Sequence, residues 1–275
     1  MNKTKIGWTD YTSNPIRARN RETGKQGHFC ERVSPGCARC YASSWNMGPY
    51  GAGVDFLPAN RDRVEFWLNE TELQEWSKPK YRGAKVFVCD MTDMFGEWVP
   101  DDWLDRIFEA MYAAPETVFQ VLTKRPERMR DYVQSHEGIG WPLANCWLGV
   151  SAENQHWADG RIPVLLDTPA VVRFVSYEPS LGPVDFWPAV SERAASLVSG
   201  IHIGRPKLDW IICGGESGPN RRRFDLNWAR SARDQCAAAG VSFYFKQAGG
   251  RYSETPSGDP ALDATKEFPV CAVAV

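Results

Sequence analysis

The stretch Thr117-Val118-Phe119-Gln120-Val121-Leu122-Thr123-Lys124-Arg125-Pro126 shows the pattern that decides the fold. Its first six residues are mostly apolar and include β-branched and aromatic side chains, which favour a buried strand. Polar and charged residues follow at once, and a proline then breaks the segment. A buried strand that runs directly into a polar loop is typical of a βα unit in a parallel sheet.

The same pattern recurs along the chain, with helical stretches between the apolar segments. We predict six strands, at Lys85–Cys89, Thr117–Leu122, Cys146–Val150, Val171–Val175, Trp210–Cys213 and Ser242–Lys246. The predicted helices include Asp101–Ala114, which starts on acidic residues, Ser191–Ser199, and Leu226–Ala239, which ends before Gly240. Alternating strands and helices indicate an α/β fold with a parallel sheet.

Polar or small residues follow each predicted strand. The charged or amide groups among them are Asp90, Lys124, Glu153, Glu178, Glu216 and Gln247. In a βα barrel these positions lie at the mouth formed by the carboxyl ends of the strands, where active sites are built. Ordinary turn residues are the alternative, because loops after strands are polar in any protein. We favour an active site, because charged and amide groups directly at the strand exits exceed what turn geometry requires.

Composition and charge narrow the class of protein. Of the 275 residues, 43% are hydrophobic and 24% are charged, as is ordinary for a globular protein. No run of about eighteen apolar residues could span a bilayer, and the start of the chain lacks a signal-peptide segment. We therefore expect a soluble, cytoplasmic protein without a membrane partner. A net charge of −2 neither favours nor excludes nucleic acid, although Arg17–Arg21 and Arg221–Arg223 supply local basic groups.

Three of the eight cysteines lie close together in the sequence. Cys30, Cys37 and Cys40 have the spacing Cys-x6-Cys-x2-Cys, and Pro35-Gly36 predicts a turn before the second of them. The reducing cytosol disfavours disulfides, so such a group indicates a metal site. Three thiolates can hold three irons of a cubane cluster and leave the fourth iron open. The scattered cysteines are expected to be small buried hydrophobes: Cys89, Cys146, Cys213, Cys236 and Cys271.

A structural zinc site is the main alternative for the cysteine group. His28 lies two residues before Cys30 and would complete a Cys3His set, and a CxxC pair is a common zinc signature. Unligated core cysteines are a third interpretation, but three cysteines within eleven residues beside a Pro-Gly turn rarely result from packing. The spacing alone leaves the cluster and the zinc site open.

Further motifs surround the cysteine group. They are Trp8-Thr9-Asp10, Asn14-Pro15, the Ser34–Ala42 core of the cysteine segment, Val121–Met129, Trp147–Ser151, Arg173–Pro179, Cys213–Pro219 and Phe245–Gln247. Together they resemble, over about residues 6–250, a family of phage- and prophage-encoded, largely uncharacterised proteins that is placed with the radical SAM enzymes. Thr92-Asp93 and Thr123-Lys124 more distantly resemble the spore photoproduct lyase branch, whose members act on a DNA lesion.

The resemblance implies a fold and two cofactors. The expected fold is a partial (β/α)6 barrel of the TIM type over residues 1–250, with an N-terminal cluster loop and a C-terminal tail at residues 251–275. The expected cofactors are a [4Fe–4S] cluster on Cys30, Cys37 and Cys40, and S-adenosylmethionine (SAM), which would be cleaved reductively to a 5′-deoxyadenosyl radical. The chain departs from the family in the long, basic loop Ile16–Phe29 and in the tail, and its first cysteine gap exceeds the usual Cys-x3-Cys-x2-Cys.

The resemblance also assigns SAM-binding roles to strand ends. Thr92 and Asp93 are expected to accept hydrogen bonds from the methionine ammonium group, with Asp90 as a further acceptor nearby. Lys124 and Ser151 suit the methionine carboxylate, because a cation and a hydroxyl both donate to an anion.

The remaining cofactor contacts implied by the resemblance concern the nucleoside. Glu153 or Asn154 is expected to hold the ribose hydroxyls. The backbone around Tyr41 and the pair Gly214-Gly215 are expected to flank the adenine, since the missing side chains of the two glycines permit close approach.

The later strand ends are assigned to the substrate: Glu178, Glu216, Lys246 and Gln247. Structural roles compete with these assignments, since Lys124 could pair with Glu178, Glu216 could pair with an arginine, and Asp93 could cap a turn.

The phage context suggests a DNA base as substrate, either a hypermodified thymine or its amino-acid adduct, modified in the host-cell cytoplasm. An electron donor such as flavodoxin or ferredoxin is the expected partner. The alternatives are a radical SAM enzyme that acts on a peptide or amino acid, and a zinc-stabilised nucleic-acid-binding module without SAM chemistry.

Overall fold

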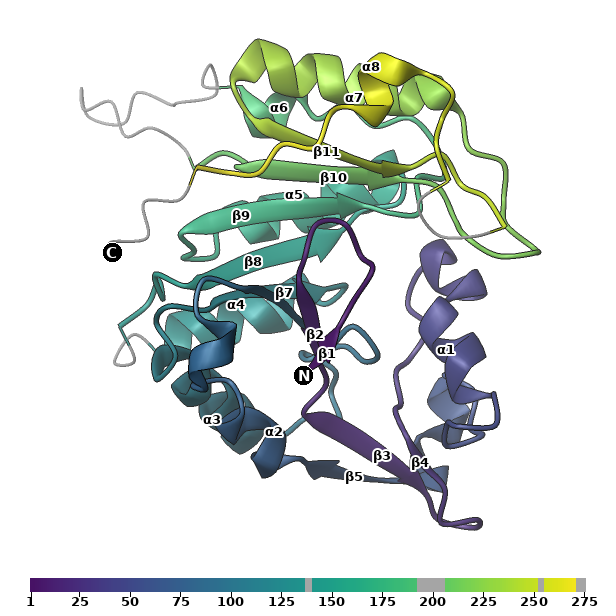
Figure 1. Cartoon of the computed structure of the whole chain (residues 1–275), viewed down its shortest axis with the longest axis vertical. Coiled ribbons are helices and arrows are strands. Elements are labelled where there is room, and N and C mark those ends of the chain that lie inside the picture. Colours follow the sequence, from purple (N-terminus) through teal and green to yellow (C-terminus); the bar gives the residue numbers. More distant parts are fainter. Residues whose placement is uncertain (137–139, 192–205, 252–254, 271–275) are drawn as a thin grey trace.

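The computed structural model describes residues 1–136, 140–191, 206–251 and 255–270. Its main element is a sheet of eight strands in the order β1-β2-β6-β7-β8-β9-β10-β11, which curls into a half-barrel (Figure 1). Neighbouring strands from β2 to β11 run parallel, and β1 pairs antiparallel with β2. The predicted α/β fold with a partial TIM-type barrel is confirmed.

All six predicted strands are present, with ends shifted by at most two residues. The strands of the main sheet are β1 (Asn2–Lys3), β2 (Tyr11–Ser13), β6 (Lys85–Val88), β7 (Val118–Thr123), β8 (Cys146–Ser151), β9 (Val172–Tyr177), β10 (Trp210–Gly214) and β11 (Ser242–Gln247). The sequence did not predict β1 and β2, because strands of two and three residues are too short to show an alternating pattern.

Helices alternate with these strands. They are α1 (Tyr41–Asn46), α2 (Glu70–Gln74), α3 (Asp101–Tyr112), α4 (Pro126–Ser135), α5 (Gln155–Leu166), α6 (Trp187–Val190), α7 (Leu226–Ala239) and α8 (Pro260–Asp263). Helix α7 has its predicted bounds, because Gly240 at φ +64° ends it in the left-handed conformation. Helix α3 ends two residues before the predicted Ala114. The predicted helix Ser191–Ser199 lies outside the described residues beyond Ser191.

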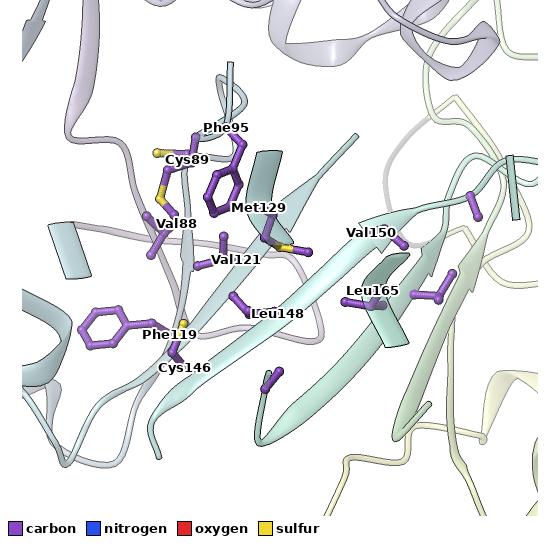
Figure 2. Close-up of a cluster of buried hydrophobic side chains, with 14 of the residues drawn as sticks. Val88, Cys89, Phe95, Phe119, Val121, Met129, Cys146, Leu148, Val150 and Leu165 are labelled. Carbon is purple, nitrogen blue, oxygen red and sulfur yellow. The ribbon is translucent and has the colours of Figure 1, made fainter. Parts of the chain in front are cut away.

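The convex face of the sheet packs against helices. Successive side chains of a strand point to opposite faces, so Val121, Leu148 and Val150 meet Met129 of α4 and Leu165 of α5 in one apolar cluster (Figure 2). Four of the cysteines expected to be buried hydrophobes are confirmed as such, while Cys271 lies outside the described residues; the four are Cys89, Cys146, Cys213 and Cys236.

The concave face is lined by aromatic side chains and covered by the N-terminal loop, residues 4–10. Trp8 from this loop lies 4.8 Å from Phe87 and 6.2 Å from Trp210, measured between ring centroids. Trp147 and Phe174 complete the cluster around Trp210. The concave face of the half-barrel is therefore filled by aromatic packing around Trp210.

A second, antiparallel sheet stands beside the open mouth. It consists of β3 (Ile16–Asn20) between β4 (Gln26–Gly27) and β5 (Val64–Leu68). Strands β3 and β4 lie in the segment Ile16–Phe29, which was predicted to be a long, basic loop. Because β4 leads directly toward Cys30, this small sheet supports the start of the cysteine segment, with α1 next to it (Figure 1).

The described part of the C-terminal tail packs against the edge strand β11. The Phe245 amide donates to the carbonyl of Thr265 at 2.9 Å, and the Phe243 amide donates to the Glu267 carboxylate at 2.9 Å. These bonds give the exposed edge of β11 partners. No helix within the described ranges is long and apolar enough to cross a membrane.

Candidate active site

A cavity of about 540 Å³ lies at the carboxyl ends of the strands. Its volume falls in the usual range of small-molecule sites, about 300–1,000 Å³. Trp8, Phe87 and Leu122 form an apolar part of its wall. The structure brings most of the predicted site residues together on this wall: Cys30, Cys37, Cys40, Tyr41, Thr92, Asp93, Lys124, Ser151, Glu178, Gly215, Glu216, Lys246 and Gln247.

The cysteine segment forms one side of the cavity. Pro35 starts a short 3₁₀ helix that carries Cys37 and ends where the Cys40 amide donates to the Cys37 carbonyl at 3.3 Å. Helix α1 then begins at Tyr41. Burial raises the pKa of the Cys30 thiol, and Asp93, Cys40 and Cys37 nearby raise it further while Arg125 lowers it. All three cysteines line the cavity.

Thr92 joins the end of β6 to the cysteine segment. Its hydroxyl donates to the carbonyl of Phe29 at 2.5 Å, and the residue is 9% exposed. Its only hydroxyl proton is therefore used in fixing the residue before Cys30, although an oxygen lone pair is left for a ligand.

Asp93 ties the end of β6 to the end of β7. One carboxylate oxygen accepts from the Thr123 hydroxyl at 2.7 Å and from the Phe95 amide at 3.0 Å. The other accepts from the Lys124 amide at 3.0 Å and from the Arg125 guanidinium at 3.1 Å. A carboxylate has about four acceptor positions, so this buried group has little capacity left for the methionine ammonium group that the sequence analysis assigned to it.

Asp90 is the acceptor in this loop with most capacity left. Its Oδ1 accepts from the Asn14 amide at 2.6 Å, and the Tyr41 hydroxyl donates to its backbone carbonyl at 2.8 Å. Burial raises the pKa of Asp90, while the hydrogen bonds from Asn14 and Tyr41 oppose this effect. Its neighbour Cys89 has φ +62°, which is unusual for a residue with a side chain and is typical of a strained functional loop.

Lys124 and Ser151 lie together as the predicted carboxylate site requires. The Lys124 ammonium donates to the Ser151 hydroxyl at 3.1 Å and lies 4.0 Å from the carboxylate of Glu153. Two of the three ammonium protons have no short partner among the described residues, so Lys124 can donate to an anion in the cavity. The alternative pairing of Lys124 with Glu178 is not what the structure shows.

Glu153 lies behind the cavity wall rather than on it. Its side chain is 0% exposed, one oxygen accepts from the Ser34 hydroxyl, and the other accepts from Arg161 at 3.1 Å. Asn154 caps α5 by accepting from the Trp157 amide at 3.3 Å. Glu153 and Asn154, which were predicted to hold the ribose hydroxyls, thus form hydrogen bonds within the protein instead.

The exits of β9 and β11 are joined by an ion pair. The Lys246 ammonium lies 3.1 Å from the Glu178 carboxylate. A Cβ atom at Gly214 would come within 2.8 Å of that carboxylate, and one at Gly215 within 2.9 Å of the Ala248 carbonyl. At both glycines the space of a side chain is therefore taken by another part of the protein. Of the two, Gly215 also lines the cavity.

Glu216 fastens the loop after β10 to the cysteine segment. Burial alone would raise its pKa, but hydrogen bonds from Arg222 lower it below the usual value. Arg222 also donates to the Pro35 carbonyl at 2.9 Å, and Arg39 lies 3.7 Å from Glu216. The structural alternative weighed for Glu216, an arginine partner, is the arrangement observed. Gln247 likewise donates to the Gly215 carbonyl at 2.7 Å.

His28 is turned toward the small sheet. Its ring nitrogens lie 3.2 Å from Arg17 Nη1 and 3.4 Å from the Ile16 carbonyl. Burial and then Arg17 lower the pKa of His28 to about 4, so its ring is neutral near pH 7. Both ring nitrogens thus face residues of β3, so His28 is not placed as a ligand beside the cysteines. Within the described ranges, no three His, Cys, Asp or Glu side chains, the three cysteines included, are arranged to hold a single metal ion. The zinc alternative therefore lacks its expected fourth ligand.

Comparison with known proteins gives one match. The family model described as "Protein of unknown function (DUF5131)" matches residues 3–266. The chain belongs to this family. The matched region of this DUF5131 protein spans the cysteine segment and nearly the whole half-barrel sheet. No curated protein and no solved structure matches the chain significantly.

Four residues that organise the site were not among the predicted site residues. Ser34, Asn14, Arg125 and Arg161 act through hydrogen bonds to Glu153, Asp90 and Asp93. Arg125 directly follows Lys124 after a predicted strand, and this position could have identified it as a site residue. Asn14 and Ser34 lie in the quoted motifs Asn14-Pro15 and Ser34–Ala42, but their partners are distant along the chain, so the motifs did not show their roles. Nothing in the sequence marks Arg161.

Proposed function

We propose that this DUF5131 protein is a radical SAM enzyme, with a [4Fe–4S] cluster on Cys30, Cys37 and Cys40 and SAM bound in the cavity beside it. One observation carries the proposal: the three thiols line the same cavity as the polar ends of the parallel strands. Thiolates are the usual ligands of iron–sulfur clusters, and three of them leave one iron free to bind another molecule. The donor set therefore fits the cluster.

The chain's own side chains suit the two ends of the methionine part of SAM. The unused donor capacity of Lys124, beside Ser151, fits the carboxylate. Asp90, rather than Asp93, has acceptor capacity left for the ammonium group, with Thr92 next to it. Tyr41 and Gly215 line the part of the cavity proposed for the nucleoside.

When bound, the reduced cluster would supply the electron that splits SAM into methionine and a 5′-deoxyadenosyl radical, with flavodoxin or ferredoxin as the proposed donor. The residues around the cavity must keep water and stray hydrogen donors away from this radical. Trp8, Phe87 and Leu122 provide an apolar wall for this purpose. The Glu178–Lys246 pair at the later strands is available to a substrate.

The proposed substrate is a phage DNA base, a hypermodified thymine or its amino-acid adduct. Two features of the rim support a nucleic acid. Trp45 is exposed on α1 and offers a stacking surface, and Arg221 and Arg223 are exposed in the loop that Arg222 holds against the cysteine segment. Aromatic rings for bases and guanidinium groups for phosphates are the usual elements of single-strand binding.

The test is an anaerobic reconstitution with iron and sulfide, followed by dithionite and SAM, with chromatography for 5′-deoxyadenosine. We expect a brown protein that produces it, and faster production or a changed base when modified DNA is added. If 5′-deoxyadenosine production did not change with DNA but increased with peptides, the proposed DNA substrate would be wrong. A colourless, zinc-loaded protein without product would contradict the enzyme.

Replacing Asp90 with asparagine is expected to weaken SAM binding by about 10–100-fold, since a hydrogen bond to a charged group contributes about 1.5–3 kcal/mol. Because burial raises the pKa of Asp90, affinity in the wild type should fall with decreasing pH earlier than an ordinary aspartate would cause. Titration calorimetry from pH 8 to pH 5 measures both effects. Asp234→Asn, at an exposed pair on α7, is the matched control and should bind like the wild type. Equal affinities in both variants would remove Asp90 from the site.

A further inference from the structure

Arg161 is a buried arginine behind the cysteine segment. Its side chain is 4% exposed, and Nη1 donates to the Ser151 carbonyl at 2.7 Å and to the Glu153 carboxylate at 3.1 Å. Nη2 is also buried but has no hydrogen-bond partner among the described residues. A buried guanidinium with unused donors is costly, so its position near the cavity calls for an anionic neighbour.

Contacts lead from Arg161 to a proposed cluster ligand. Glu153 accepts from Arg161 with one oxygen and from the Ser34 hydroxyl with the other. The Ser34 hydroxyl lies 3.7 Å from the Cys37 sulfur. A Cβ atom at Gly36 would come within 2.4 Å of the Glu153 carboxylate, so the turn before Cys37 rests directly on it. The segment that holds Cys37 is therefore seated on a buried ion pair.

The charges around Glu153 do not cancel. Arg161 lies on one side at 3.1 Å and Lys124 on the other at 4.0 Å, so two cations flank one carboxylate. The net charge of this group is positive. In a poorly hydrated interior such a charge acts strongly on its neighbours.

We propose that Arg161 and Glu153 are positioning residues that seat the Cys37 turn and set the charge beside the cluster, an inference that rests on the proposed function. The reduced cluster carries one more negative charge than the oxidised cluster. A neighbouring positive charge therefore favours reduction, and a neighbouring negative charge opposes it, as net charge is one of the factors that set cluster potentials.

The two single variants should therefore shift the reduction potential in opposite directions. In Arg161→Met the reduction equilibrium should become about tenfold less favourable, which is about 59 mV more negative for one electron. In Glu153→Gln it should become about tenfold more favourable. The double variant E153Q/R161M has the wild-type net charge at this place and should return close to the wild-type potential. Redox titration followed by electron paramagnetic resonance measures all three.

Conservative and distant substitutions complete the design. Arg161→Lys keeps the charge and should keep the potential. Arg173→Met removes a half-buried guanidinium that is bonded to the Thr168 carbonyl at 3.1 Å and does not line the cavity, and it should leave the potential unchanged. Shifts of the same sign in Arg161→Met and Glu153→Gln, or no shift in either, would overturn the proposal.

Hydrogen exchange of the cluster-free chain separates this inference from the proposed function. In Glu153→Gln, amides of residues 31–40 should exchange at least several-fold faster, while Arg173→Met should leave them unchanged. If the wild type takes up no cluster, the proposed function fails, and this exchange result alone decides whether the pair seats the turn. Unchanged exchange in Glu153→Gln would overturn the seating role.

Discussion

Alanine in place of Cys37 is expected to abolish both cluster retention and 5′-deoxyadenosine production. Removing one of three thiolates leaves an iron without its protein ligand. Among the described residues, the other cysteines that line the cavity are Cys30, Cys40 and the buried Cys89. The fold should survive, because Cys37 is half-buried in a surface turn. Iron and sulfide analysis after reconstitution, together with chromatography of the reaction mixture, measures the loss.

Cys146→Ala is the matched control for this variant. Cys146 is 1% exposed at the start of β8, at the opposite end of the strand from the cavity. Its loss should lower the free energy of unfolding by about 1–2 kcal/mol through a small cavity in the core and leave cluster loading intact. Equal loading in both variants would mean that the metal binds elsewhere, and equal loss would point to general destabilisation.

The strands of the half-barrel were predictable because each is a short apolar run that ends in polar residues. Helix α7 was predictable to the residue, since Gly240 marks its end. Strand β2 was not, because its three residues become a strand through pairing with β6, a tertiary contact. The same holds for β3 and β5, which pair with each other across more than forty residues of chain.

The location of the site was also predictable, but the division of roles within it was not. Strand-end polar residues do gather around one cavity with the cysteines. The sequence could not show that Glu153 is occupied by Ser34, 119 residues away, or that Asp93 is occupied by Arg125. Whether a carboxylate binds a ligand or a neighbouring side chain depends on such partners, and their pairing, unlike their positions, has no signal in the sequence.

Replacing Asp93 with alanine is expected to lower the free energy of unfolding by about 3–5 kcal/mol. The substitution removes the acceptor of four hydrogen bonds and leaves the Arg125 guanidinium, 13% exposed, with Glu31 at 3.7 Å as its remaining counter-charge. Breaking a buried ion pair by removing one partner leaves an uncompensated charge, which is the source of the large cost. At about 2–4 °C per kcal/mol the melting temperature should fall by roughly 10 °C, as measured by calorimetry and urea unfolding.

Asp131→Ala is the matched control for Asp93→Ala. The Asp131 carboxylate is 65% exposed and pairs with Arg130 at 2.7 Å on the surface of α4, so its loss should change stability by less than about 0.5 kcal/mol. If Asp93→Ala were equally mild, the carboxylate would not be committed to joining β6 and β7. It would then be free to accept from the methionine ammonium group as the sequence analysis expected, and Asp90 would lose that role. A large difference in the free energy of unfolding between the two variants would instead support a structural role for Asp93, which joins the ends of β6 and β7 beside the cavity.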